Sequence, residues 1–246
     1  MNAFVLAGGR STRMGRDKAL LDLDGRPLID HALTKLRALG FSPRIAGSRP
    51  DLSSFAPFVP DNYPQQGPLG GIEAALAATA NPEMLYPEVS TLELTRPSGS
   101  GNLAETSKRE HLLRICSSDA EQNLFLAVDL PWLPIEFLRW MTERAQHTNA
   151  LATVPRAQGL PQPLCAIYSR AIQPHAQAAL AKDDAKVMRA VERAATATRL
   201  RIDSFDAESI AASQLWEQRL PVHWWFQNLN SPADFQTALE QSRRIP

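Results

Sequence analysis

The chain has 246 residues, 44% of them hydrophobic, and its 26 basic residues balance its 26 acidic ones. This length and composition favour a single folded domain with a substantial core. The even charge balance gives no overall attraction to nucleic acid, and no apolar run approaches the length of a membrane span. The first apolar run is short and follows no basic segment, so we expect a cytoplasmic protein. Its two cysteines, Cys116 and Cys165, are far apart and are expected to be reduced structural thiols.

The first predicted element is a buried strand over residues 3–6 that runs into a glycine-rich, basic segment ending at Lys18. Glycines allow successive backbone N–H groups to converge on phosphate oxygens. Arg13 can add a planar guanidinium fork and Lys18 a point charge. This pattern indicates an anion-binding loop, although glycines and basic residues alone leave an ordinary solvated surface loop equally open.

The spacing of this segment excludes two common phosphate loops. A Walker A loop needs a lysine directly after its last glycine, but two residues separate Gly15 from Lys18. The dinucleotide-binding fingerprint needs alternating glycines, whereas Gly8 and Gly9 are adjacent. A different class of nucleotide-binding loop is therefore expected.

The order of residues 6–21, LAGGRSTRMGRDKALL, resembles the opening motif of the molybdenum cofactor guanylyltransferase (MobA) family of Rossmann-like nucleotidyltransferases. The matching residues are Leu6, Ala7, Gly8, Gly9, Ser11, Arg13, Met14, Gly15, Asp17, Lys18, Leu20 and Leu21. The resemblance implies transfer of GMP from GTP to molybdopterin with release of pyrophosphate. It also implies that the nucleotide is bound by Leu6, Ala7, Gly8, Gly9 and Lys18.

Short strands and helices alternate after this segment. Pro27 is expected as the first residue of a helix whose apolar residues recur at helical spacing and which ends at Gly40. Residues 44–46 and 58–59 are predicted as strands. This alternation favours an α/β fold, a mostly parallel sheet with helices on both faces. Ligands of such sheets bind beyond the carboxyl ends of the strands, so the polar residues there are candidates.

The sequence QGPLGGI, residues 66–72, predicts a tight turn leading into an alanine-rich helix that ends near Ala80. On its own it is a turn that needs no ligand. A GPLGGI motif after an aspartate is also a second family motif, and the resemblance implies that it lines the guanine pocket. Gly70, Asp61 and Ser48 are then expected to bind the nucleotide, with Ser48 at a position where family members often carry asparagine.

Residues 82–122 lose all periodicity and are rich in Pro, Ser, Gly, Thr and Glu. Family members cross this region in a few residues. Structureless stretches of this length inside a domain are lids or insertions, and we favour a mobile surface insertion over a functional lid. The whole chain, residues 1–246, is expected to form one nucleotidyltransferase domain interrupted by this insertion.

Residues 123–128 form a continuous apolar run, typical of a strand buried on both faces, and Asp129 follows it directly. A carboxylate at this position suits Mg²⁺, which takes one or two carboxylates together with phosphate and water oxygens. Its alternative role is to cap the following helix. The resemblance to the family's DxPxL motif, here Asp129, Pro131 and Leu133, favours the metal.

Later elements are a helix over residues 134–146, strands over 151–154 and 162–168, and a helix over 184–194 with an outward basic face of Lys186, Arg189 and Arg193. Ser231 and Pro232 are expected to begin a closing helix. This helix cap leaves the two preceding asparagines unexplained. The resemblance to the family's NxNTPxD motif implies that Asn228 and Asn230 contact molybdopterin.

Together these features predict a guanylyltransferase with Mg²⁺ as cofactor and Arg13, Lys18 and Asp129 as catalytic residues. The expected partners are GTP, molybdopterin and proteins that deliver the product to molybdoenzymes, with no nucleic acid and no membrane. No triad or strong base is visible, and none is needed when the nucleophile is already a phosphate oxygen. The alternatives are a cytidylyltransferase or sugar-phosphate nucleotidyltransferase of the same fold, or a non-catalytic nucleotide-binding regulator.

Overall fold

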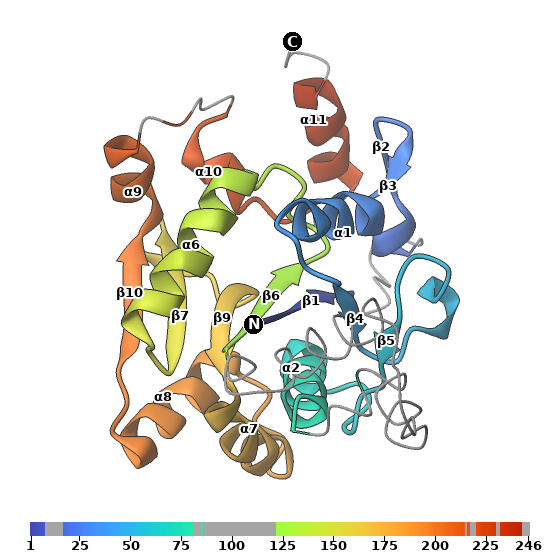
Figure 1. Cartoon of the computed structure of the whole chain (residues 1–246). Coiled ribbons are helices and arrows are strands. Elements are labelled where there is room, and N and C mark those ends of the chain that lie inside the picture. Colours follow the sequence, from blue (N-terminus) through green and yellow to red (C-terminus); the bar gives the residue numbers. More distant parts are fainter. Residues whose placement is uncertain are drawn as a thin grey trace, which may run out of the picture.

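The computed structural model describes residues 1–7, 17–80, 85, 122–214, 216, 220–229 and 232–242. In this part of the chain, eight strands form one sheet in the order β10-β7-β9-β6-β1-β4-β5, with β8 beside β7 (Figure 1). The strands are β1 (Asn2–Leu6), β4 (Arg44–Ala46), β5 (Phe58–Val59), β6 (Gln122–Ala127), β7 (Ala152–Ala157), β8 (Leu160–Pro161), β9 (Cys165–Ser169) and β10 (Ile202–Asp206). The strands β2 (Asp22–Leu23) and β3 (Arg26–Pro27) pair as a separate hairpin.

The half of the sheet around β1 is entirely parallel. Strand β1 pairs in parallel with β4 and β6, and β4 pairs in parallel with β5. Leu6, the last residue of β1, lies opposite both Ala46 and Ala127. Strand β9 is antiparallel to its neighbours β6 and β7. The expected mostly parallel α/β sheet is confirmed, and the carboxyl ends of β1, β4, β5 and β6 meet at one edge.

Helices cover both faces of the sheet (Figure 1). One face packs against α1 (Leu28–Ala38), α6 (Ile135–Thr148), α9 (Ala207–Ser213), α10 (Val222–Trp225) and α11 (Pro232–Ser242), and the other against α2 (Gly67–Ala78), α7 (Gln173–Leu180) and α8 (Val187–Thr198). Short 3₁₀ turns, η1 (Lys18–Leu20), η2 (Pro50–Leu52) and η4 (Arg170–Ile172), complete the described elements. Because side chains alternate along a strand, Val5 enters the first core and Phe4 the second.

Most predicted elements agree with the structure, with a few differences at their ends. Strands β4 and β5 have the predicted bounds. Pro27 was expected inside the first helix, but it caps α1, which begins at Leu28. Gly40 follows that helix with φ of +85°, as its role of ending the helix requires. The outward basic face of α8 is confirmed for Arg189 and Arg193, which are about half exposed and both pair with Asp184.

The expected insertion over residues 82–122 lies outside the described residues, except at two positions. Leu85 is buried, and Gln122 is already the first residue of β6. The predicted end of the insertion therefore ran one residue too far. Cys165 is a buried free thiol in β9, as expected, and Cys116 lies outside the described residues. Within the part of the chain that the structure describes, no helix combines the length and apolarity needed to span a bilayer.

Candidate nucleotide site

The candidate site lies at the edge where β1, β4, β5 and β6 end. The register aligns Leu6 with Ala46 and Ala127, and Ala46 with Val59. The residues that continue beyond these four strand ends are Ala7, Gly47–Ser48, Pro60–Asp61 and Val128–Asp129. The main chain closes this edge tightly, because the Val128 N–H donates to the Leu6 carbonyl at 3.2 Å. The topology thus gathers Ser48, Asp61 and Asp129, which are up to 81 positions apart in the chain.

Lys18 and Asp129 form an ion pair at this edge. The Lys18 Nζ donates to Asp129 Oδ2 at 2.7 Å, and the two side chains are only 15% and 12% exposed. Lys18 is the first residue of η1, and the preceding Asp17 caps this turn by accepting a hydrogen bond from the Ala19 N–H at 3.0 Å. The two residues that the sequence singles out for phosphate and metal are therefore brought into contact.

Asp129 does not cap a helix. Helix α6 begins at Ile135 with Pro134 as its capping residue, so this alternative role is wrong. The loop after Asp129 is held instead by Lys35 of α1, whose ammonium donates to the Pro131 carbonyl at 2.6 Å. Burial, with a smaller effect from the charge of Arg26, lowers the pKa of Lys35 to about 8. Sequence reasoning did not identify Lys35, because its position on α1 looks like an ordinary solvent-facing lysine.

Ser48 and Asp61 interact across the ends of β4 and β5. The Asp61 N–H donates to the Ser48 hydroxyl at 2.9 Å, and the Ser48 N–H donates to Asp61 Oδ2 at 3.5 Å. The other carboxylate oxygen, Oδ1, is buried and has no hydrogen-bond partner among the described residues. Burial raises the pKa of Asp61, and the hydrogen bond from Ser48 partly offsets this rise. A buried acceptor without a donor is costly, so Oδ1 is a natural place for a ligand N–H or O–H group.

The glycines that begin α2 pack against this aspartate. A Cβ on Gly71 would lie 3.6 Å from Asp61 Oδ1 and 3.4 Å from the Ala46 carbonyl oxygen. A Cβ on Gly70 would lie 2.9 Å from the Tyr63 carbonyl oxygen, closer than real Cβ atoms approach. Glycine at 70 is therefore required by the close approach of the chain. The QGPLGGI sequence keeps the start of α2 close to the backbone of β4 and to Asp61.

Arg49 lies at the candidate site, and sequence reasoning missed it. It is buried, and its guanidinium donates to the Ala7 carbonyl at 2.7 Å, to Asp17 and to Asp51. An arginine two residues before an aspartate is too common a pattern to predict such a contact. Only the tertiary structure shows that Arg49 joins the end of β1 to the start of η1.

The donor set at Asp129 suits a magnesium ion completed by its substrate. Among the described residues, no group of three or more His, Cys, Asp or Glu side chains could hold a metal ion. Mg²⁺ needs no such group, because one carboxylate with phosphate and water oxygens is sufficient. The single buried carboxylate of Asp129 fits that arrangement, and it does not fit a metal bound by protein side chains alone.

Several predicted site residues cannot be placed in this geometry. Gly8, Gly9, Arg13 and Asn230 lie outside the described residues. Asn228 is described and exposed in the segment between α10 and α11. From the predicted set, the structure joins Lys18 to Asp129 and Ser48 to Asp61 at the edge where β1 ends at Leu6. Gly70 lies in the first turn of α2, against the Tyr63 carbonyl.

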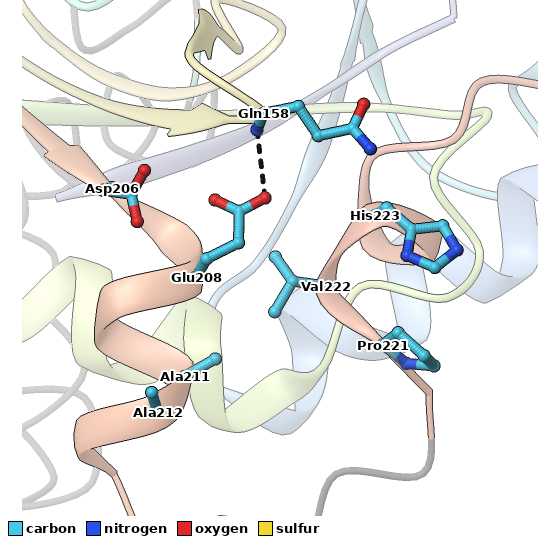
Figure 2. A pocket seen from close by; sticks show the side chains of 8 residues that line it. All are labelled: Gln158, Asp206, Glu208, Ala211, Ala212, Pro221, Val222 and His223. Carbon is cyan, nitrogen blue, oxygen red and sulfur yellow. Dashed lines mark hydrogen bonds between the residues drawn. The ribbon is translucent and has the colours of Figure 1, made fainter.

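A separate hollow lies at α9 and α10 (Figure 2). In the strand order, its strands β7 and β10 lie on the opposite side of β9 from the candidate site. It has a volume of about 580 Å³ and is lined by Gln158, Asp206, Glu208, Ala211, Ala212, Pro221, Val222 and His223. The Gln158 N–H donates to Glu208 Oε1 at 3.0 Å within it, as the dashed line in Figure 2 shows. None of the described residues that line it belongs to the predicted site.

Comparisons with known proteins identify the family and the fold of the chain. Residues 3–198 match the family model of the MobA-like NTP transferase domain. A probable molybdenum cofactor guanylyltransferase of Methanothermobacter thermautotrophicus is 30% identical, covering 94% of each chain. One of Carboxydothermus hydrogenoformans is 28% identical over 98% of this chain and 95% of its own. The crystal structure of molybdopterin-guanine dinucleotide biosynthesis protein A from Archaeoglobus fulgidus superposes with a TM-score of 0.68 over the whole of both chains, at 21% identity. The chain is therefore a member of the MobA-like NTP transferase family.

Proposed function

We propose that this protein transfers GMP from GTP to molybdopterin, forming the guanine dinucleotide cofactor and releasing pyrophosphate. The observation that carries the proposal is the ion pair between Lys18 of η1 and Asp129, which follows β6, within a chain of the MobA-like family. Full-length relatives named as molybdenum cofactor guanylyltransferases support the choice of reaction.

The proposed reaction is a displacement at phosphorus. A terminal phosphate oxygen of molybdopterin attacks the α-phosphorus of GTP, forming a new P–O–P bond, and the bond to the β-phosphate oxygen breaks so that pyrophosphate leaves. The nucleophile is already an anion, so the protein need not remove a proton from it. The main barriers are bringing two anions together and stabilising charge on the leaving group, and both are lowered by positioning and local positive charge.

Each residue of the site has a role in this proposal. Asp129 would hold Mg²⁺, which would supply positive charge beside the phosphates of the nucleotide. Lys18, together with Arg13, binds the triphosphate, and the backbone of Leu6, Ala7, Gly8 and Gly9 lies against the nucleotide. The Lys18 ammonium lies 2.7 Å from Asp129 Oδ2, so the cation and the carboxylate lie side by side. Asn228 and Asn230 are proposed to contact molybdopterin.

We assign recognition of the base to Asp61, Ser48 and Gly70. Guanine carries N–H donors on its N1 and N2 atoms, and a carboxylate can accept from both. Asp61 offers a buried oxygen without a partner among the described residues, and Ser48 fixes the orientation of the carboxylate. Gly71, in the first turn of α2, has no side chain to crowd this oxygen.

The proposal is tested by replacing each member of the ion pair. Lys18→Ala and Asp129→Ala should each abolish pyrophosphate release in the presence of GTP, molybdopterin and Mg²⁺. Both variants should keep the far-ultraviolet circular dichroism spectrum of the parent, and the double variant removes any effect of leaving one charge unpaired. Lys182→Ala, at an exposed lysine, is the matched control and should stay active. Activity near that of the parent in either single variant would contradict the proposal.

A further inference from the structure

Arg49 connects the described residues on either side of the glycine-rich segment 8–16. Its Nη1 donates to the carbonyl oxygen of Ala7, directly after β1, at 2.7 Å. Its Nη2 pairs with Asp17, the residue before η1. These two partners are ten positions apart in sequence, and Arg49 itself follows Ser48 of the proposed nucleotide site. One side chain therefore fixes the position of Ala7 relative to Asp17.

The guanidinium of Arg49 already has partners within the protein. Besides Ala7 and Asp17, Asp51 accepts hydrogen bonds from Nε at 3.0 Å and from Nη2 at 2.7 Å. The hydrogen bond to Asp51 raises the pKa of Arg49, and the nearby carboxylate of Asp17 raises it as well. The guanidinium side chain is only 10% exposed. A buried arginine paired with two carboxylates is poorly suited to bind phosphate directly, so its role is to position other groups.

The contact with Asp17 leads to Lys18. Asp17 uses Oδ2 to pair with Arg49 and Oδ1 to accept the Ala19 N–H, so the same carboxylate is bonded on both sides. The second of these bonds caps η1, whose first residue is Lys18. Lys18 then reaches Asp129 at 2.7 Å. A continuous set of contacts thus runs from Arg49 through Asp17 to the ammonium group of Lys18.

We propose that Arg49 is a positioning residue for nucleotide binding: it fixes Ala7 and Asp17, and through Asp17 it places the Lys18 ammonium. The inference rests on the proposed function, in which Lys18 binds the triphosphate. It adds a residue that touches no substrate and acts through Lys18. Lysine cannot replace it, because a single ammonium lacks the planar fork that reaches Ala7, Asp17 and Asp51 together.

The test is a double-mutant cycle on the dissociation constant for GTP in the presence of Mg²⁺, using the parent, Arg49→Lys, Lys18→Ala and the double variant. If Arg49 acts through Lys18, the two effects are not additive. Arg49→Lys should weaken GTP binding about tenfold in the parent and less than about twofold in the Lys18→Ala background. GTP binding is measured by isothermal titration calorimetry at a temperature at which every variant is folded, as checked by its thermal unfolding. A weaker affinity then reports on the site and not on a loss of stability.

Asp51→Asn is the matched control, because it leaves the contacts of Arg49 with Ala7 and Asp17 in place. It should change the GTP dissociation constant by less than about twofold. Asp17→Asn weakens the same contact from the side of Asp17, because asparagine still caps η1 but pairs less strongly with Arg49. This variant replaces Arg49→Lys in the cycle if Arg49→Lys does not fold. It should also weaken GTP binding in the parent, and weaken it less in the Lys18→Ala background.

Three results would overturn the inference. If Arg49→Lys weakened GTP binding equally in the parent and in the Lys18→Ala background, Arg49 would not act through Lys18. Weakening by Asp51→Asn as large as that by Arg49→Lys would show that the contacts with Ala7 and Asp17 are not the important ones. Normal GTP binding by Arg49→Lys, beside impaired binding by Lys18→Ala, would refute the inference and leave the proposed function intact. Normal binding by Lys18→Ala would contradict the proposed function as well.

Discussion

Among single residues, Asp61 has the environment best suited to choosing a base. Its Oδ2 oxygen faces the Ser48 N–H, whereas Oδ1 is buried without a partner among the described residues. A ligand that donates a hydrogen bond to this oxygen gains more binding free energy than it would at an exposed acceptor. The oxygen has already lost its water in the folded protein, so binding does not have to remove it. A hydrogen bond to a charged group contributes about 1.5–3 kcal/mol, and this range sets the size of the expected effect.

Asp61→Asn should weaken GTP binding by about tenfold or more, because the amide accepts only through one oxygen and its NH₂ group opposes the donors of guanine. The affinity of the parent should also fall as the pH is lowered, starting at a higher pH than an ordinary aspartate would give. Burial raises the pKa of Asp61, and the protonated acid accepts less well. Titration of the GTP phosphates affects parent and variant alike, so superimposable pH profiles of the two would contradict the assignment.

Lys35 provides a second prediction, this one about stability. Its pKa is lowered to about 8 in the folded protein, from an ordinary value of 10.5. Between these two values the unfolded chain binds a proton that the folded protein does not, so the free energy of unfolding attributable to Lys35 rises with pH. Below pH 8 both states are protonated and this contribution is constant.

The measurement is urea unfolding of the parent and of Lys35→Met at several pH values from 7 to 10. The difference in free energy of unfolding, parent minus variant, should increase with pH above about 8, by at most about 1.4 kcal/mol per pH unit. Lys182→Met, at an exposed lysine, should show no such trend. A flat or falling difference for Lys35→Met would mean that the ammonium is not buried against the Pro131 carbonyl as described.

Sequence reasoning identified the residues of the site that belong to compact motifs. Lys18, Asp61 and Asp129 each follow a strand end or a glycine-rich segment, and the resemblance to the family assigned each a role. Arg49 and Lys35 were missed for a physical reason. Arg49 donates to the Ala7 carbonyl and Lys35 to the Pro131 carbonyl. These contacts span 42 and 96 positions, and no local sequence pattern predicts them.

Among the elements, the first turn of α2 shows most directly how backbone packing shapes the site. Gly70 lies against the Tyr63 carbonyl and Gly71 against Asp61. The sequence predicted a tight turn over residues 66–72 ahead of the helix, but α2 already begins at Gly67, so most of these residues are helical. It did not show that the two glycines have different neighbours, because that depends on how α2 sits on β4 and β5.

The two glycines can be separated by experiment. Gly70→Ala would place its Cβ 2.9 Å from the Tyr63 carbonyl oxygen, so the chain must shift, at a cost of about 1–3 kcal/mol of stability. Gly71→Ala meets its nearest atoms at 3.4–3.6 Å, an ordinary contact, so the stability should hold. Its methyl group should weaken GTP binding, since it fills space beside Asp61 Oδ1. Urea unfolding and GTP titration of both variants check this, and equal behaviour of the two variants would contradict it.

In the molecule as a whole, the parallel half of the sheet brings the site together. Two cores, one on each face, hold β1 and β6 at the centre of the sheet. The alternating sequence pattern predicted this architecture, since short apolar strands followed by helices leave few other arrangements. Strand β9 was predicted, but its antiparallel direction was not. The elements α7, α9, α10 and β10 and the hairpin of β2 and β3 were not predicted, because their short or mixed patterns carry weak periodicity.

The central claim, transfer of GMP to molybdopterin, is tested most directly by nucleotide selectivity. Purified protein is incubated with molybdopterin, Mg²⁺ and either GTP, CTP or UTP, and pyrophosphate release is measured with and without the pterin. We predict release with GTP that depends on molybdopterin, and at least about a hundredfold less with CTP or UTP, because a site that hydrogen-bonds one base edge rejects the others strongly. Comparable release with CTP or UTP, or none with GTP, would contradict the proposed function.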